Sequence, residues 1–391
     1  MNENRLHAQL RTFKEIKDQY ESAFRNTPLA RFLSSYFKAH PKMGSGDRRT
    51  ASTLLYDYYR LGRACPGPDL YQRLALALFL CEDESAFCTL LNPRLSKTIA
   101  AELDAKLVQA GQEMDFKLKD IFPGLDAVSP EVDIPEFLKN HLIRPRVYMY
   151  TYPGKQAAVK HSLDQNAISY IEHGAHTLSV LSGTPLQNIS ALKGTYEIQD
   201  FASQQVENVY QAKPGEQWWD ACAGSGGKAI VFSQQHPQVQ LTVSDIRPSI
   251  LRNLEARFEQ AGLQVFRKKI LDLRYSIDQV FGDTLFDGIL LDAPCSGSGT
   301  WSRTPEMLSS FSPKDIASFA QRQEQMATHV LPFLKPGKPL VYVTCSVYRQ
   351  ENEAVVEALI NQGMQLESMQ YIKGYTQGGD TLFVARLIKG K

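Results

Sequence analysis

The stretch Gln217-Trp-Trp-Asp-Ala-Cys-Ala-Gly-Ser-Gly-Gly-Lys228 decides the fold. Its first residues, 217–221, are typical of a buried strand, and the glycines that follow open a turn into a helix. Glycines at 224, 226 and 227 let a ligand approach the backbone, and the helix N-terminus adds free N–H donors. Strand, glycine-rich turn and helix in this order predict an α/β domain that binds a nucleotide.

Two acidic residues follow the next strands. Asp245 ends the expected strand 239–245 and lies 19 residues after Gly226, a suitable place for a carboxylate that holds ribose hydroxyls. Asp272 follows the third strand and is a candidate partner of an adenine amino group; a helix cap or a surface turn explains it equally well. These features indicate an adenosine-containing ligand, and a lone glycine loop does not separate NAD from S-adenosylmethionine.

The rest of the C-terminal half alternates strands and helices. We expect further strands at 264–267, 286–292 and 339–344, with late strands near 364–369 and 382–388. The clearest helix, 315–334, carries an apolar stripe. This alternation predicts a mainly parallel, doubly wound, Rossmann-like sheet that is covered by helices on both faces.

The chain of 391 residues is too long for one ordinary core, so we expect several domains. Residues 1–125 have the apolar spacing of a helical bundle. After a Pro- and Gly-rich stretch, residues 140–205 predict a small α/β module, and residues 206–391 form the nucleotide-binding domain. Tyr148, Tyr150 and Tyr152 alternate on one strand of the module, which indicates either a base-stacking platform or core packing.

Composition excludes several classes of protein. The formal net charge of +1 gives no sign of a polyanionic partner, so any such surface must be local. No apolar run approaches the roughly 20 residues that span a bilayer, and the N-terminus lacks a secretory stretch. The six cysteines show no metal-binding spacing. We therefore expect a cytoplasmic protein with reduced thiols and no metal; we also expect a monomer, although no residue pattern bears on this.

Two cysteines each follow a buried strand. Cys295 lies in Asp292-Ala-Pro-Cys-Ser-Gly-Ser-Gly299, and Cys345 lies in Val341-Tyr-Val-Thr-Cys-Ser-Val347. Ligands bind at the carboxyl ends of strands in such sheets, and a thiolate is a strong nucleophile near neutral pH. Glycines 297 and 299 leave room for a planar substrate. We favour covalent catalysis over the alternative that Cys295 is a small buried turn residue.

These motifs resemble those of the Sun-type, RsmB-like (Nol1/Nop2/Sun) family of S-adenosylmethionine-dependent RNA cytosine-C5 methyltransferases. The resemblance covers about the last half of the chain. It is carried by residues 220–228, 292–300 and 344–347, by Gln199-Asp-x-Ala-Ser203, by Arg303, Gln321 and Gln323, and by Glu351-Asn-Glu353. One departure is Ser225, where the family usually has proline. The N-terminal helices faintly resemble a divergent NusB-like RNA-binding domain, and the module at 140–205 would also contact RNA.

The resemblance implies a role for each site residue. Cys345 would add to C6 of cytosine so that C5 can accept a methyl group, Asp292 would hydrogen-bond or protonate N3, and Cys295 would assist release of the product. S-adenosylmethionine is the implied cofactor. Its implied binding residues are Cys222, Ala223, Gly226, Gly227, Lys228, Asp245, Asp272 and Asp292. Lys228 has a structural role as its alternative.

The implied substrate is a single-stranded or flipped cytosine in RNA, with ribosomal RNA as first choice and transfer RNA as second. A DNA cytosine methyltransferase would leave Cys345 idle, and an adenine-N6 enzyme would need an aromatic residue near position 295. An NAD oxidoreductase would leave both cysteines unexplained. The alternative from another class is a non-catalytic RNA-binding or ribosome-assembly factor that retains the methyltransferase fold.

Overall fold

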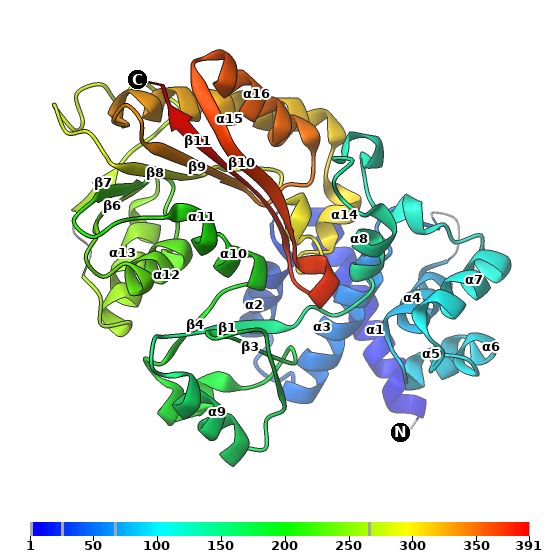
Figure 1. Ribbon diagram of the computed structural model, residues 1–391. Coiled ribbons are helices and arrows are strands. Elements are labelled where there is room, and N and C mark those ends of the chain that lie inside the picture. The colour runs from blue at the N-terminus through cyan, green and yellow to red at the C-terminus, as the bar shows by residue number, and fades with distance from the viewer. Residues whose placement is uncertain (1–2, 25–26, 66–68, 265–266, 391) are drawn as a thin grey trace. The chain divides into compact units, whose positions relative to one another are not determined.

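The computed structural model describes residues 3–24, 27–65, 69–264 and 267–390 (Figure 1). It divides into two compact units. The first contains the residues up to Asp126 together with Asp133–Arg144 and Trp301–Pro313. The second contains Ala127–Val132, Pro145–Thr300 and the residues from Lys314 onward. Each unit therefore includes a short segment that the sequence places within the other.

The first unit is helical. Its helix α4 (Leu70–Cys81) is apolar, and its residues from Leu74 to Leu80 are buried. Asp69 caps this helix by accepting hydrogen bonds from the N–H groups of Tyr71 and Gln72. The other helices of the unit are α1 (Glu3–Gln19), α2 (Leu29–Ala39), α3 (Ser45–Arg60), α5 (Ala86–Leu91), α6 (Pro93–Ser96), α7 (Leu103–Met114), α8 (Ile134–Asn140) and α14 (Glu306–Ser310). Among the described residues, no helix has the length and apolar character that crossing a membrane requires.

The second unit begins with a small antiparallel sheet of order β2-β3-β1-β4. Its strands are β1 (Val147–Thr151), β2 (Tyr170–Glu172), β3 (Thr177–Val180) and β4 (Tyr196–Ile198). Helix α9 (Gln156–Gln165) packs on one face, where Met149, Val159 and Leu178 form part of a small core. The strand expected from the alternating tyrosines is present as β1. The short, largely exposed strand β2 was not predicted.

The opposite face of β1 carries the tyrosine stripe. Tyr148, Tyr150 and Tyr152 are all buried. The Tyr148 hydroxyl donates to the backbone carbonyl of Gln377, and the Tyr150 hydroxyl accepts a hydrogen bond of 2.7 Å from Gln235. The stripe therefore packs the module inside the second unit, so the core-packing interpretation is correct and the stacking platform is not.

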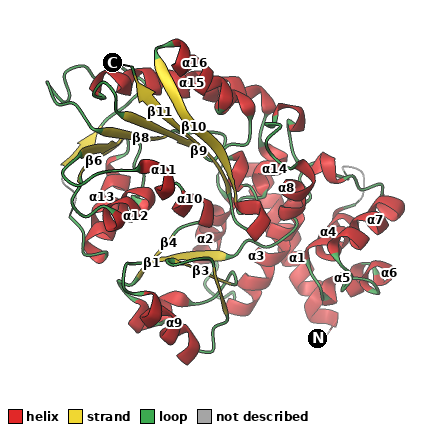
Figure 2. Ribbon diagram, viewed as in Figure 1, coloured by secondary structure: helices red, strands yellow, loops and turns green. Residues whose placement is uncertain are grey.

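The larger sheet of the second unit has seven strands in the order β10-β11-β9-β8-β5-β6-β7 (Figure 2). Strands β9, β8, β5, β6 and β7 are parallel, and β10 and β11 are antiparallel additions. The strands are β5 (Gln217–Asp220), β6 (Gln240–Asp245), β7 (Arg267–Ile270), β8 (Gly288–Asp292), β9 (Pro339–Thr344), β10 (Met364–Lys373) and β11 (Thr381–Lys389). The predicted α/β fold with a mainly parallel sheet is thus confirmed.

Helices cover both faces of this sheet (Figure 1). On one face lie α10 (Phe201–Gln205), α11 (Glu207–Tyr210), α12 (Gly227–Gln235) and α13 (Pro248–Gln260); on the other lie α15 (Ile316–Val330) and α16 (Glu353–Asn361). The predicted strand 264–267 includes residues 265 and 266, which lie outside the described residues. The observed edge strand β7 begins at Arg267, three residues later than expected.

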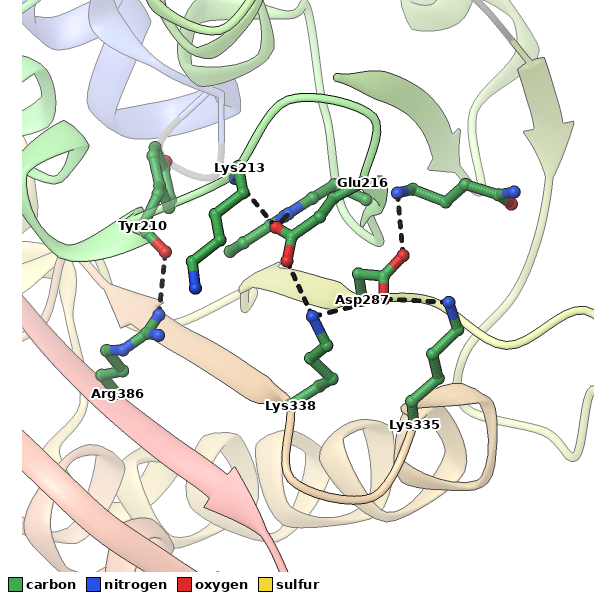
Figure 3. Close-up of polar contacts among 9 residues, drawn as sticks. Tyr210, Lys213, Glu216, Asp287, Lys335, Lys338 and Arg386 are labelled. Carbon is green, nitrogen blue, oxygen red and sulfur yellow. Dashed lines mark hydrogen bonds and ion pairs between the residues drawn. The ribbon is translucent and has the colours of Figure 1, made fainter. Parts of the chain in front are cut away.

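Charged residues gather where the parallel strands begin (Figure 3). Lys338 donates to the carboxylate of Glu216 at 2.7 Å, and Lys335 donates to that of Asp287 at 2.9 Å. Burial alone would raise the pKa of both carboxyl groups, but the hydrogen bonds and charges of the lysines, together with further N–H donors, lower it. At the amino-end edge of the sheet, ion pairs with lysines therefore neutralise these carboxylates.

Candidate active site

A cavity of about 500 Å³ lies at the opposite, carboxyl-end edge of the large sheet. Its walls include Asp245 at the end of β6, Asp292 at the end of β8, and Cys345 directly after β9. These residues are far apart in the sequence. They meet because the carboxyl ends of parallel strands share one edge, which is where open α/β sheets bind ligands.

The glycine-rich turn forms one wall of the cavity. Gly226 precedes α12 with a φ of +89°, and a Cβ there would lie 2.8 Å from the Leu254 side chain, so glycine is required. The N–H group of Gly224 donates to Asp245 at 3.2 Å. Ser225, the departure from the usual proline, accepts a hydrogen bond of 2.6 Å from Arg257 through its hydroxyl. Arg257 thus holds the loop that proline would otherwise stiffen.

Two arginines bind the acidic residues that follow β6 and β7. Arg247 donates to both carboxylate oxygens of Asp245, at 3.0 and 3.1 Å, and Arg274 does the same to Asp272, at 2.9 and 2.7 Å. Burial alone would raise the pKa of Asp245, but hydrogen bonds from Arg247 lower it; the hydrogen bond from Arg274 lowers the pKa of Asp272. Sequence reasoning missed both arginines, although the spacing Asp-x-Arg occurs at both sites.

The two cysteines meet in this cavity. Their Sγ atoms are 3.2 Å apart, and both are free thiols. The hydrogen bond with Cys345 raises the pKa of the Cys295 thiol well above its usual value, and burial raises it further. Cys295 therefore holds its proton across the neutral range, next to a second thiol that can receive or return one.

A buried group of charges lies behind the thiols. Lys228 Nζ is 2.7 Å from Asp292 Oδ2. Burial lowers the pKa of Lys228, but the charge and hydrogen bond of Asp292, together with the neighbouring Cys345 and Asp220, raise it by more, so the net pKa is raised. Burial and the nearby charge of Asp292 raise the pKa of Asp220 to about 8. Titratable groups with strongly shifted pKa values at the end of a cavity are typical of functional sites.

The cavity brings together most of the predicted site residues. Cys222, Asp245, Asp272, Asp292, Cys295 and Cys345 all line it. Ala223, Gly226, Gly227 and Lys228 form the turn and the first residues of α12 behind its wall, and Lys228 reaches the site through Asp292. Sequence reasoning missed further lining residues, namely Ile246, Leu273, Arg322 and Met326.

One expectation about the Cys295 loop is wrong. Gly299 does not make room for a substrate: a Cβ there would lie 2.1 Å from the backbone oxygen of Thr381. The N–H group of Gly299 donates to the carbonyl of Cys345 at 2.8 Å. Glycine at this position therefore allows two backbone segments to approach closely, and so helps to place Cys345.

Comparison with known proteins gives relatives for this half of the chain. Residues 208–385 match the model of the family described as 16S rRNA methyltransferase RsmB/F. Ribosomal RNA small subunit methyltransferase B of Erwinia tasmaniensis is 32% identical over 206 residues, which are 50% of this chain and 48% of that protein. The chain spans about half the length of the curated relatives it matches.

Solved structures show the same fold. The crystal structure of the protein PH0851 matches with a TM-score of 0.71 and 19% identity, covering 93% of this chain and 95% of that one. NSun6 from Pyrococcus horikoshii, crystallised with SFG, matches with a TM-score of 0.59 and 17% identity over 68% of this chain and 100% of its own. The second unit thus has the Rossmann-like fold of class I methyltransferases. Residues 208–385 of this chain are thus similar to the RsmB/F, or Sun-type, methyltransferase family.

Proposed function

We propose that this protein transfers the methyl group of S-adenosylmethionine to C5 of a cytosine in RNA, through a transient bond between Cys345 and C6 of the base. The observation that carries the proposal is the pair of thiols: Cys295 and Cys345 have their Sγ atoms 3.2 Å apart on a cavity that Asp292 also lines. The names of the curated relatives make ribosomal RNA the first candidate substrate; transfer RNA stays the second candidate from the sequence resemblance alone.

The residues of the cavity fit S-adenosylmethionine. A volume of about 500 Å³ lies within the range of small-molecule sites. Asp245 offers its carboxylate to ribose hydroxyls, with the turn at 222–228 beside the methionine part and Asp272 near adenine. Ile246 is exposed yet lines the cavity, so an apolar base edge would cover it. When bound, the cofactor supplies an electrophilic methyl group on a sulfonium.

Before they can bind ribose and adenine, Asp245 and Asp272 must each lose at least one hydrogen bond from Arg247 or Arg274. The Arg247 side chain is 60% exposed and that of Arg274 is 51% exposed, so each can turn into solvent at little cost. Asp245 itself is largely buried, at 7% exposure, and stays in place. The two arginines thus hold the empty carboxylates in the ionised form and release them to a ligand.

The chain's own residues supply the covalent chemistry. Cys345 in its thiolate form adds to C6 of cytosine, and the electron pair of the C5–C6 double bond moves toward N3. Asp292 must first take up a proton from solvent; in this protonated form it donates a hydrogen bond or proton to N3, and Lys228, 2.7 Å from Asp292, stabilises the carboxylate that remains. C5 gains the nucleophilic character that methyl transfer requires.

Product release needs a second proton transfer. After methylation, C5 must lose its proton and Cys345 must leave C6, which restores the double bond. Solvent takes the C5 proton, and Cys295 donates its own proton to the departing Cys345 thiolate, because its thiol is 3.2 Å from that of Cys345 and keeps its proton at neutral pH. The target base has to leave its stack to reach both thiols, so single-stranded or flipped RNA is the expected substrate.

An assay with labelled S-adenosylmethionine tests the proposal. The full chain is incubated with the labelled cofactor and total RNA from a strain that lacks the protein, and the RNA is digested to nucleosides. We expect label in 5-methylcytidine, and bisulfite sequencing of the same RNA then locates the cytosine. Cofactor binding without 5-methylcytidine in any RNA would contradict the proposal and favour a non-catalytic RNA-binding or ribosome-assembly factor.

A further inference from the structure

A buried carboxylate connects the loops that carry the two cysteines. Glu351 has 0% exposure. Its Oε2 atom accepts hydrogen bonds from the N–H group of Ser296, at 2.8 Å, and from Gln323 Nε2, at 3.0 Å. Its Oε1 atom accepts a hydrogen bond of 2.6 Å from the Ser346 hydroxyl. Since Ser296 follows Cys295 and Ser346 follows Cys345, one carboxylate binds the neighbour of each thiol.

Further hydrogen bonds hold Glu351 and both loops in place. Gln323 also donates to the carbonyl of Pro294, the residue before Cys295, at 3.1 Å. The Tyr342 hydroxyl donates to the backbone carbonyl of Glu351 at 2.7 Å, and Asn352 donates to the carbonyl of Ser346 at 2.8 Å. Each cysteine loop is therefore bound to the same cluster, which we call the Glu351 cluster (Gln323, Tyr342, Glu351 and Asn352).

The charge of Glu351 makes a purely structural role costly. Within the ranges that the structure describes, no lysine, arginine or histidine forms an ion pair with it. A buried ion without an opposite charge loses several kcal/mol of hydration, of which hydrogen bonds from neutral donors return only a part. A neutral side chain could fill this volume at lower cost, so a carboxylate at this position indicates a use at the site.

We propose that Glu351 is a positioning residue, which holds the Cys295 and Cys345 thiols at their short separation through Ser296 and Ser346. The purpose of this placement rests on the proposed function, whereas the placement itself can be measured without RNA or cofactor. A second effect supports the assignment. The hydrogen bond with Cys345 and burial raise the pKa of Cys295, and the charge of Glu351 raises it further, which keeps the proton that product release would use.

Closure of a disulfide between the two thiols reports their separation. The full chain is treated with a diazene such as diamide, whose N=N bond takes up the two thiol hydrogens and becomes a hydrazine while the S–S bond forms. The two sulfur atoms must approach from 3.2 Å to about 2.05 Å. The rate is followed by mass spectrometry of the linked peptides that contain Cys295 and Cys345.

Three variants separate placement from charge. Glu351→Ala removes all three side-chain hydrogen bonds, and we expect closure to slow at least about tenfold and methylation to fall about 10²-fold in kcat, with a smaller change in KM. Glu351→Gln keeps the shape and can donate to the Ser346 hydroxyl, so closure should stay within about twofold of wild type. Glu357→Gln removes an exposed charge from the same segment and should change neither rate.

The outcomes are decisive for the inference. Wild-type closure in a folded Glu351→Ala variant would overturn it. If that variant does not fold, as judged by circular dichroism, Ser346→Ala removes the hydroxyl that donates to Glu351, together with its longer hydrogen bonds to Ser296, Ser298 and the N–H group of Tyr348. It should slow closure about fivefold; an unchanged rate would equally overturn the inference. Failure of wild-type protein to methylate RNA, with the expected order of closure rates intact, would refute the proposed function and leave the positioning role standing.

Discussion

Carboxyl groups at the two edges of the large sheet differ in their pairing with opposite charges and in the direction of their pKa shifts. At the amino-end edge, Glu216 and Asp287 are bound by lysines 338 and 335 at 2.7 and 2.9 Å, and both carboxyl groups have lowered pKa values (Figure 3). At the carboxyl-end edge, Asp220 is buried and its pKa is raised to about 8, and one of its carboxylate oxygens has no hydrogen-bond partner.

This difference separates the end of the sheet that stabilises the fold from the end that holds the reactive groups. Both edges consist of loops that join the same strands, so strand geometry alone does not decide their chemistry. The amino-end edge satisfies its charges, which favours the folded state. The carboxyl-end edge raises the pKa of Asp220 to about 8 and raises that of Cys295, and such shifted pKa values are typical of a catalytic site.

Cys345→Ala is expected to have the largest effect at the carboxyl-end edge. Without the sulfur atom, C6 of cytosine has no nucleophile, and methylation should fall by about 10³-fold or more. The rate of 5-methylcytidine formation measures the loss. Cys88→Ala, a buried thiol in the helical unit, is the matched control and should retain activity; equal losses in both variants would point to general instability.

Cys295→Ala should arrest the reaction at a later stage. The nucleophile is intact, so the RNA becomes attached, but the elimination that frees it loses its proton carrier. We expect a protein–RNA adduct that survives a denaturing gel and turnover reduced by about 10²-fold. An adduct that accumulates with Cys345→Ala instead would mean that the two cysteines have exchanged roles.

Asp245→Ala should weaken cofactor binding more than it slows chemistry. Loss of the carboxylate that holds the ribose hydroxyls is expected to raise KM for S-adenosylmethionine about tenfold, with kcat changed less than threefold. Steady-state kinetics at saturating RNA give both constants. Asp283→Ala, which changes an exposed acid in the loop before β8 and outside the cavity, serves as the control; a raised KM in this variant as well would show that the effect is not specific to the ribose site.

Asp220→Asn should change how stability depends on pH. The pKa of Asp220 is near 8 in the folded chain and near its ordinary value of 3.8 when unfolded. Between about pH 4 and pH 8 the folded state therefore keeps a proton that the unfolded state has released. Wild-type stability therefore falls over this range, by at most about 1.4 kcal/mol per pH unit from this group. Urea unfolding at pH 5, 6.5 and 8 should show a shallower fall in the variant; parallel slopes would contradict the raised pKa.

Asp287→Asn should have the smallest effect, and a purely structural one. The variant loses ion pairs to Lys335 and Lys338, whose side chains are 40% and 34% exposed, so we expect a loss of about 1 kcal/mol of unfolding free energy. This stabilisation comes from a lowered pKa, so it is present above about pH 4 and is lost as pH falls. Methylation at neutral pH should be unchanged. A large loss of activity would show that the amino-end edge also contributes to catalysis, which would contradict the difference drawn between the two edges.

Much of this fold could be predicted from the sequence. The predicted positions of the buried strands β5, β6, β8 and β9 agree with the structure to within about two residues. The edge strand β7 was misplaced because Arg267-Lys-Lys-Ile270 has no apolar alternation, and β2 was missed because three largely exposed residues give no pattern. Strand ends correctly indicated the acids and cysteines of the cavity, since parallel strands bring these ends together.

The remaining parts of the site depend on tertiary contacts. The hydrogen bond between Glu351 and Ser296 joins residues 55 positions apart, and no local pattern of apolar or turn residues predicts it. The motif Glu351-Asn-Glu353 marked the segment without giving it a role. The arginines beside Asp245 and Asp272 were hidden for another reason: they are charged, exposed residues of a kind that usually interacts with solvent.

The exchange of segments between the two units has a consequence for biosynthesis. Helix α14 packs against α3 in the first unit, so this unit stays incomplete until residues 301–313 have been synthesised. In the second unit, the N–H group of Ser129 donates to the carbonyl of Val347. The segment 127–132 therefore cannot make this contact until residue 347 has been synthesised. Neither unit can therefore finish folding on the ribosome before most of the other exists, and fragments cut between them would each lack a piece of their own core.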